Sequence, residues 1–303
     1  MISRTRFLLA LAASATFAAS SWAADSVKIV LVAGKVKEVD KMGHHDYLGG
    51  CRLMQVLLKQ NPGIDAVLVN EEWPADEKVF EGAAAVVFYT DGGGKQAYLA
   101  TPEHVALVQK MADGKVGLVN LHQAVEFTPA FAQQSMSWTG AVYNGLSSRG
   151  HWDSSHDVFP KHAITSGVTP WKINDGWLNH LQFPAEMKGI TPLVWSGKEK
   201  LGSPEGGDKD IVGWTYDRPS GGRSFSFSGL DAHGAWEQAG MRQLVINGVL
   251  WSAGVEIPAG GAKCEADKAL IDSFMTPRIA PPKKVKAEGA PAPGAAVEKA
   301  EVK

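Results

Sequence analysis

The sequence predicts an α/β fold in which a mostly parallel central sheet lies between two layers of helices. Short, almost wholly apolar segments recur from residue 27 to residue 121, and segments with helical spacing lie between them. The apolar segments are continuous and do not alternate with polar residues. Continuous apolar strands that alternate with helices are typical of parallel sheets buried on both faces.

The first half of this pattern is regular. Residues 27–34 (VKIVLVAG) form an apolar run that predicts the first strand. Residues 46–63 then show leucine spacing typical of a helix, which Asn-Pro-Gly ends. Apolar runs at 65–69 and 83–94 predict the second and third strands, and the third ends in a glycine cluster.

The next helix carries clear end signals. Thr101 is suited to the N-cap, Pro102 to the first helical position and Gly114 to the C-cap of a helix over 101–114. Residues 116–121 (VGLVNL) predict the fourth strand, which runs directly into a histidine.

The second half is less regular. Residues 130–215 are rich in Trp, Gly, Ser and His, and we expect excursions over the sheet with strands near 191–195 and 210–216. A late strand is predicted at 224–229, and helical spacing returns from Trp236 to about Trp251.

The two ends of the chain differ in character from the middle. Residues 1–24 have basic residues, an apolar run and small residues near Ala23, as in a secretory signal peptide. We therefore expect a periplasmic or secreted protein, with an uncleaved anchor as the alternative. Residues 25–260 form the expected folded domain. Residues 261–303 are rich in Pro, Ala and Lys and are expected to be a disordered tail.

Composition and missing motifs exclude several classes of function. A net charge of −2 without a basic stripe argues against nucleic acid as a partner. After the signal segment no stretch is long and apolar enough to span a membrane, so no integral membrane protein is expected. The first strand is not followed by G-x-G-x-x-G, which argues against a nucleotide cofactor. Cys51 and Cys264 could pair, but a buried, unpaired Cys51 is the preferred interpretation.

Polar side chains follow four of the predicted strands where those strands end. Parallel strands present their carboxyl ends at one edge of the sheet, and ligands of such folds bind there. The residues that gather at this edge are His44, His45, Asp46, Asp91, Gly92, Gly93, Gly94, Lys95, His122, Gln123, Glu126, Asp231 and His233. The convergence of imidazole and carboxyl groups predicts a site at this edge.

Further candidates lie between the fourth and the last strand. They are His151, His156, His162, His180 and Asp175. Three tryptophans that flank polar candidates could stack on sugar rings, and these are Trp152, Trp177 and, after the last strand, Trp236. The predicted substrate-binding residues are Asp91, Gly92, Gly93, Trp152, Asp175 and Trp177. Any of these could instead be structural, with the histidines in the core or in loops, the tryptophans in the core and the glycines in a tight turn.

Two kinds of chemistry fit the histidines and carboxylates. Together they suit zinc, manganese, iron or nickel, and the predicted metal ligands are His44, His45, His122, Asp231 and His233. Histidine also titrates near neutrality and therefore suits proton transfer, for which we select His122, Glu126 and His151.

Over residues 27–257 the chain resembles the trehalose-utilisation (ThuA-like) family. The motifs that carry the resemblance are VGLVNLHQAVEF, GHW, HAITSGV, DGWLNH, GGRSFSFSGLDAHGAW and NGVLWSAG, in that order. The resemblance implies a flavodoxin-like three-layer sandwich, similar to class I glutamine amidotransferases. Those enzymes carry a nucleophilic cysteine at or near the position of His122, so glutamine hydrolysis is not expected here.

The family motifs transfer residue by residue, with two departures. The family's recurrent site residues match His122, Glu126, His151, His162 and Asp175. The glutamate that follows the aspartate in the family is Gly176 here. The late loop has two histidines in relatives but Asp231 and His233 in this chain, which puts an imidazole-only site in doubt.

The resemblance implies a link to carbohydrate metabolism, including 3-keto sugars. Our first hypothesis is therefore an exported hydrolase, lyase or isomerase that acts on a small carbohydrate by metal-assisted acid–base chemistry. The alternatives are a carbohydrate-binding protein without catalysis and a partner-binding domain, for which a co-exported sugar dehydrogenase is the candidate partner.

Overall fold

A seven-stranded sheet forms the centre of the molecule in the computed structural model, which describes residues 26–37, 40–197, 207 and 210–278. The strands are β1 (Val27–Ala33), β2 (Ile64–Val69), β3 (Ala83–Tyr89), β4 (Gly117–Leu121), β5 (Ser148–His156), β6 (Trp171–Asn179), β7 (Ile190–Trp195), β8 (Ile211–Asp217) and β9 (Arg223–Phe227). The α-helices are α1 (Tyr47–Leu58), α2 (Pro102–Asp113), α3 (Ala132–Thr139), α4 (Ala239–Ser252) and α5 (Lys268–Ser273).

The strand order of the sheet is β2-β1-β3-β4-β9-β8-β7. The first five of these strands are parallel, whereas β8 and β7 pair antiparallel. An order that begins 2-1-3-4 and continues with the next parallel strand is that of flavodoxin-like sheets. The predicted flavodoxin-like, amidotransferase-like fold is therefore confirmed.

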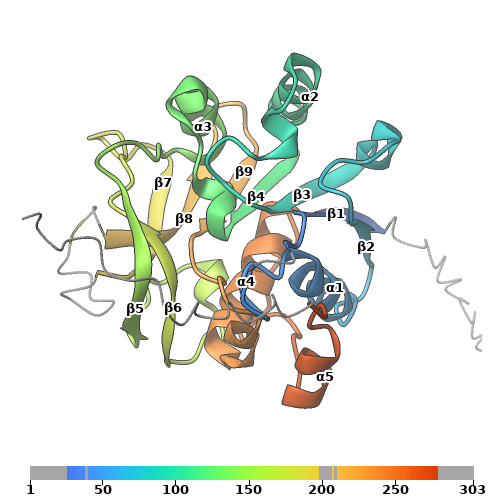
Figure 1. Cartoon of the computed structure of the whole chain (residues 1–303), viewed down its shortest axis with the longest axis vertical. Helices are drawn as coiled ribbons and strands as arrows, with labels where there is room; N and C mark the ends of the chain where they lie inside the picture. The colour runs from blue at the N-terminus through green and yellow to red at the C-terminus, as the bar shows by residue number, and fades with distance from the viewer. Residues whose placement is uncertain (1–25, 38–39, 198–206, 208–209, 279–303) are drawn as a thin grey trace, which may run out of the picture.

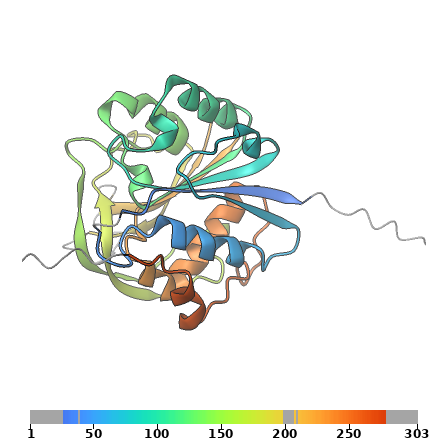
Figure 2. The same ribbon diagram turned by 45° about the vertical axis from the view of Figure 1, so that its right-hand side comes forward.

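Helices cover the sheet on both faces. Helices α1, α4 and α5 lie on one side, and α2 and α3 on the other (Figures 1 and 2). The apolar side chains of α1 and α4 share one core cluster with one face of the strands, and those of α2 and α3 share a second cluster with the other face. Both faces of the sheet are therefore buried against apolar side chains, which explains why the sequences of β1 and β3 are continuous apolar runs.

Most of the predicted elements are found within a few residues of their expected bounds. In α2, the Thr101 side chain accepts a hydrogen bond from the backbone of His104, and Gly114 is the C-cap. Cys51 is fully buried in α1, and both cysteines are free. In the part of the chain that the structure describes, no helix has both the length and the apolar character of a membrane span.

The β5–β6 hairpin was not predicted as a distinct element. It forms a separate two-stranded antiparallel sheet, and β5 (SRGHWDSSH) is mostly polar, with buried positions only near its end. A polar strand of this kind gives no apolar signal, because its stability comes from pairing with β6 along its whole length. Helix α4 also starts later than expected, since Trp236 lies in a 3-10 turn, η8 (His233–Glu237).

The C-terminal boundary needs correction. Residues 261–278, which we expected to belong to a disordered tail, pack on the domain and include α5. Cys264 and Ile271 are buried there, and the Arg242 side chain donates a hydrogen bond to the backbone carbonyl of Cys264. The few apolar residues of this short segment were outweighed by the Pro-, Ala- and Lys-rich composition of residues 279–303. The remainder of the predicted tail and the predicted signal peptide lie outside the described residues.

One buried histidine makes stability depend on pH. His156 is 2% exposed between Trp171 and Trp177, and burial lowers its pKa to about 3. The unfolded chain takes up this proton near pH 6.5, so stability is complete above that pH and falls as the pH drops toward 3. The expected loss is about 1.4 kcal/mol per pH unit.

We therefore expect the His156→Phe variant, which keeps the aromatic stacking, to lose less stability than the parent between pH 6.5 and pH 4. Urea unfolding followed over this pH range measures the difference. A His104→Phe variant, changed at a partly exposed histidine, serves as the control. An unchanged pH dependence in His156→Phe would refute the explanation.

Candidate functional site

The loops that follow β1 and β9 are joined by backbone hydrogen bonds. The amide of His45 donates to the carbonyl of Asp231 at 2.8 Å, and the amide of His233 donates to the carbonyl of Gly43 at 2.6 Å. His44 and Ala232 form an isolated antiparallel bridge between them. This pairing brings His44 and His45 beside Asp231, although they lie far apart in the sequence.

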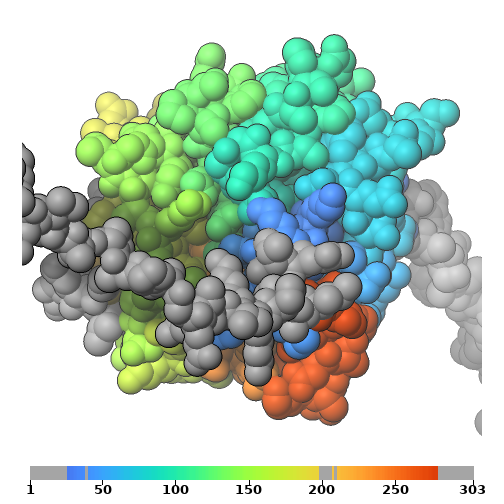
Figure 3. Space-filling model, viewed as in Figure 1, coloured from blue at the N-terminus to red at the C-terminus, as the bar shows by residue number. Residues whose placement is uncertain are grey.

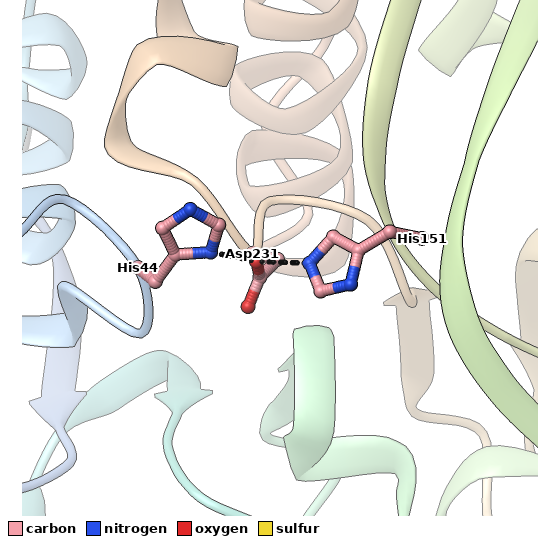
Figure 4. A group of neighbouring side chains, drawn as sticks. All are labelled: His44, His151 and Asp231. Carbon is pink, nitrogen blue, oxygen red and sulfur yellow. Dashed lines mark hydrogen bonds and ion pairs between the residues drawn. The ribbon is translucent and has the colours of Figure 1, made fainter. Parts of the chain in front are cut away.

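The carboxylate of Asp231 lies at the centre of four imidazoles. Its Oδ2 is 2.6 Å from His44 Nδ1 and 2.8 Å from His151 Nε2. Its Oδ1 is 2.9 Å from His45 Nε2 and 3.2 Å from His122 Nε2. Figure 4 shows His44 and His151 approaching Asp231 from opposite sides, one from the β1 loop and the other from β5. Four of the predicted site histidines thus meet at one residue that is 1% exposed.

Backbone strain accompanies this convergence. His45, His122 and Leu230 have positive φ angles of 47°, 54° and 72°. Left-handed conformations cost energy in residues with a side chain, and they persist where the surrounding structure imposes them. In His122 this conformation occurs at the sharp turn from β4 into the 3-10 turn η3 (His122–Val125).

Asp175 holds the Asp231 loop in place. Its buried carboxylate accepts hydrogen bonds from the backbone amides of Leu230, Asp231 and Ala232, at 2.7, 3.1 and 3.3 Å. Burial raises the pKa of Asp175 to about 6. The predicted role of Asp175 in substrate binding is therefore replaced by a positioning role, because its oxygens face the backbone.

Gly176 leaves the space that Asp231 occupies. A Cβ at this position would lie 2.6 Å from the Cβ of Asp231 and 3.2 Å from His151 Nε2. No L-residue with a side chain fits there without moving the carboxylate. The glycine that departs from the family motif is thus explained by the packing of this site.

Two of the imidazoles have their orientation set by a second partner. His122 Nδ1 lies 3.0 Å from the backbone carbonyl of Ser228, which only accepts, so Nδ1 carries the proton. His45 Nδ1 lies 3.1 Å from a carboxylate oxygen of Asp40. In their neutral forms both histidines therefore direct an unprotonated Nε2 toward Asp231. This arrangement, with the outer nitrogen bound to a carbonyl or carboxylate, is typical of histidines that bind metals.

His122 Nε2 gives the sharpest indication of a cation. It is buried, and its 3.2 Å approach to Asp231 does not meet hydrogen-bond geometry, so it has no hydrogen-bond partner among the described residues. A lone pair on nitrogen and an anionic oxygen repel each other at this distance unless a proton or a metal ion lies between them. The nitrogen and carboxylate donors therefore fit a divalent transition metal.

The histidines strongly affect the charge of Asp231. Burial alone would raise the pKa of its carboxyl group, but His122, His45 and His151 hold that pKa well below its usual range. Burial lowers the pKa of His45, but its hydrogen bonds to Asp231 and Asp40 outweigh burial and leave this pKa raised. The centre therefore contains an ionised carboxylate that requires positive charge nearby.

A cavity of about 410 Å³ opens onto this centre. It is lined by Lys37, Asp40, His45, Asp91, Lys95, His122, Gln123, Arg149, Gly150, His151, Gly176, Trp177, Leu178 and Asp231. In Figure 3 the surface of the β1 loop (blue) lies between the green residues after β4 and the orange-red α5. A larger groove of about 730 Å³ surrounds Trp73 and His104, but it contains none of the predicted site residues.

Asp91 lines the cavity, whereas Gly92 and Gly93 are not among its lining residues. Lys37 donates to Asp91 Oδ2, and the Tyr47 hydroxyl reaches Oδ1 at 3.4 Å. The glycines serve backbone packing, because a Cβ on Gly92 would lie 2.4 Å from the carbonyl oxygen of Gln123. Gly93 donates its amide to the carbonyl of Glu126 at 2.8 Å. Their predicted contact with substrate stays a prediction.

Glu126 lies behind Arg149 and does not line the cavity. Arg149 Nη1 donates to both carboxylate oxygens of Glu126, at 3.2 and 2.9 Å. Burial raises the pKa of Glu126, and Arg149 only partly offsets this effect. The arrangement makes Glu126 the anchor of an arginine that faces the cavity.

Three predicted residues differ from their expected roles. His233 is buried away from Asp231, with Nδ1 3.2 Å from Asp46 Oδ2 and Nε2 2.8 Å from the carbonyl of Ile271. It therefore ties η8 to α1 and α5 and is not a ligand of this centre. Trp177 is 1% exposed and offers no open face for a sugar ring. Trp152 is partly exposed, donates to Ser196 and is not among the residues that line the cavity.

Several residues of the site were missed or received no role. Arg149 precedes the GHW motif and was overlooked, because a lone arginine carries no pattern. Lys37 and Asp40 lie in a charged loop that looks like ordinary surface in the sequence. Their contacts with Asp91 and His45 become visible only in the fold. Gln123 was noted after β4, and its amide lies 3.3 Å from His45 Nε2.

Comparison with known proteins places the chain in a family. A model of the trehalose-utilisation family, ThuA, matches residues 30–252. A protein from Bacteroides uniformis described as ThuA-like has a similar structure, with a TM-score of 0.56, 10% identity, and coverage of 75% of this chain and 91% of that one. A ThuA-like protein from Parabacteroides merdae has a TM-score of 0.53 and 14% identity, with coverage of 79% of this chain and 98% of that one. These similarities show the fold alone, and no curated protein matches the sequence.

The packing around Gly176 yields a test of the site. We expect Gly176→Ala to displace Asp231 and to weaken divalent-metal binding at least tenfold, because the new Cβ overlaps that of Asp231. Gly145→Ala is the matched control, since a Cβ there meets nothing within 4 Å. Titration of Mn²⁺ into both variants measures the effect, and equal affinity in the two would contradict the proposed packing.

Proposed function

The chain belongs to the trehalose-utilisation (ThuA) family, and we propose that it is an enzyme that acts on a sugar or glycoside by metal-assisted acid–base chemistry. One observation carries the proposal: the buried Asp231 carboxylate faces four histidine nitrogens at the floor of a cavity. A buried anion with so many nitrogen donors serves no evident structural need, because Asp175 already fixes the loop.

His45, His122 and Asp231 are the residues best placed to hold a divalent ion. Their ligand atoms lie within 4.8 Å of one another, and the outer nitrogens of both histidines are already bound. Such an ion polarises a carbonyl oxygen and stabilises the negative charge that develops on it. Zinc, manganese, iron and nickel all accept this set of donors.

The lining of the cavity suits a polyhydroxylated substrate. Lys37, Asp40, Asp91, Lys95 and Arg149 place charged hydrogen-bonding groups around it. A volume of about 410 Å³ lies within the range of small-molecule sites. Among the described lining residues the one aromatic side chain, Trp177, is buried. A sugar-binding protein would be expected to offer an open aromatic face, so catalysis is the better supported function.

For a 3-keto glycoside the chemistry is an elimination. Asp91 lines the cavity and takes the proton from the carbon between the keto carbon and the anomeric carbon. The electron pair of this C–H bond is first delocalised onto the keto oxygen. It then forms a double bond between the deprotonated carbon and the anomeric carbon. The bond from that carbon to the departing oxygen breaks, and this oxygen receives the proton that Asp91 accepted. No electrons are gained or lost overall.

The pair formed by Glu126 and Arg149 positions the substrate. Arg149 faces the cavity with a side chain that is 58% exposed, whereas its partner carboxylate is nearly buried. The guanidinium retains donors beyond those bound to Glu126, because it carries five. These donors can reach substrate hydroxyl groups, while Glu126 limits the movement of the arginine.

The substrate and the cellular location complete the proposal. A 3-keto sugar arises by two-electron oxidation of a ring hydroxyl group, so a sugar dehydrogenase must act first. The predicted signal peptide favours export, and a co-exported dehydrogenase would then supply the substrate in the same compartment.

Loss of His122 tests the metal-dependent part of the function. We expect His122→Ala to lose its metal and to lower turnover of a 3-keto glycoside about 100-fold or more, since His122 supplies a buried ligand nitrogen. Elemental analysis and release of the leaving alcohol measure the two effects, with His104→Ala as the control. Full turnover by a folded His122→Ala variant would contradict the proposal.

Two carboxylate variants separate proton transfer from positioning. We expect Asp91→Asn to keep its metal but to lose turnover, because the amide cannot accept the proton. Glu126→Gln should leave kcat nearly unchanged and raise KM about tenfold, the effect of losing roughly 1.4 kcal/mol of a charge-assisted contact. Steady-state kinetics distinguishes them, and a reversed pattern would assign the base to Glu126.

A further inference from the structure

We propose that Asp231 bridges two divalent metal ions, one bound through each of its carboxylate oxygens. This inference rests on the proposed function and deepens it, because it defines both the metal centre and the substrate group that the centre recognises. The observation behind it is that the described residues able to share an ion form two sets of three, with Asp231 common to both.

The first set lies deeper in the molecule. It consists of His45 Nε2, His122 Nε2 and Asp231 Oδ1, at 2.9 and 3.2 Å from nitrogen to oxygen. Two ligand atoms on one tetrahedral ion are about 3.3 Å apart when each lies about 2.0–2.1 Å from the metal. The observed separations are therefore close to those of ligands that share an ion.

The second set lies on the outer side of the same carboxylate. It consists of His44 Nδ1, His151 Nε2 and Asp231 Oδ2, and the nitrogen-to-oxygen distances of 2.6 and 2.8 Å are those of hydrogen bonds. An ion held here would replace the shared protons and widen these two contacts. The side chains of His44 and His151 are 26% and 55% exposed and those of His45 and His122 are 26% and 3% exposed, so the difference in depth between the two sets comes from His151 and His122. Of the three residues in the second set, His151 and Asp231 line the cavity, so an ion held here would be accessible from it.

A single ion explains this arrangement less well. If all four histidines bound one ion, their nitrogens and the carboxylate would form one mutually close set, but they fall into two. Each carboxylate oxygen has its own pair of imidazoles. Metal ions in two-metal sites lie about 3.5–4 Å apart, a spacing that one bridging carboxylate can span.

The surroundings favour unequal affinity at the two positions. His45 and His122 are oriented by Asp40 and by the carbonyl of Ser228, so little entropy is lost when the inner ion binds. Asp40 also lines the cavity, and its contact with His45 places further negative charge beside the inner position. We therefore expect the inner position to fill first and the outer position to fill at higher metal concentration.

Two adjacent ions would recognise two adjacent oxygens. A keto group beside a hydroxyl group, as in a 3-keto sugar, presents such a pair. An ion held by the outer set would have three protein ligands and would leave coordination positions free for a substrate oxygen. The substrate class is thus narrowed to α-hydroxyketones, and isolated ketones or simple alcohols should bind much more weakly.

Mn²⁺ titration of the metal-free, full-length protein tests the inference. We expect about two Mn²⁺ per chain by calorimetry, and an exchange-coupled electron paramagnetic resonance spectrum when both positions are filled. The variant His44→Ala/His151→Ala should bind one Mn²⁺ and give an uncoupled spectrum. His104→Ala, changed outside the centre, should bind two.

The outcomes separate this inference from the proposed function. One Mn²⁺ in the parent, lost in His122→Ala but retained in His44→Ala/His151→Ala, would overturn the bridge and leave a one-metal enzyme. No Mn²⁺ in a folded parent would overturn both metal proposals. If the double variant does not fold, His151→Ala alone, at the most exposed of the four histidines, must still lower the stoichiometry from two to one.

Discussion

A buried carboxylate surrounded by four imidazoles is the constraint on which the rest of the site depends. Asp231 is almost inaccessible to solvent, and an isolated ionised carboxylate at such a position would cost several kcal/mol. Its charge therefore has to be balanced locally, by protonated histidines or by metal ions. Asp175, Gly176 and the paired β1 and β9 loops all keep the carboxylate at the point where that balance is possible.

The fold supplies this point through the geometry of its parallel strands. The carboxyl ends of β1, β3, β4 and β9 lie at one edge of the sheet, so loops that are remote in sequence meet there. The β5–β6 hairpin closes the remaining side and contributes His151. Positive φ angles at His45, His122 and Leu230 accompany the turns that bring these loops together.

The sequence was sufficient to predict most of the sheet and the meeting of His44, His45, His122 and Asp231, whereas His151 was a separate candidate from the middle of the chain. The end of each strand can be located where its continuous apolar run stops. Because ligands of such sheets bind at the carboxyl ends of the strands, the polar residues that follow these runs were predicted to form the site. The contacts that His233, Asp175 and Trp177 make could not be predicted, because residue type does not reveal which way a side chain points. Arg149 and the packed segment 261–278 had no periodic signal, so only long-range contacts identify them.

The central claim is that the Asp231 centre holds a divalent metal, and elemental analysis of the untagged, chelator-free protein beside its Asp231→Asn variant tests it most directly. The variant keeps the size of the side chain but removes its charge. The account predicts near-stoichiometric transition metal in the parent and none in the variant. Absence of metal from the folded parent, even after reloading, would contradict the claim and leave the histidines as proton-transfer or sugar-binding groups.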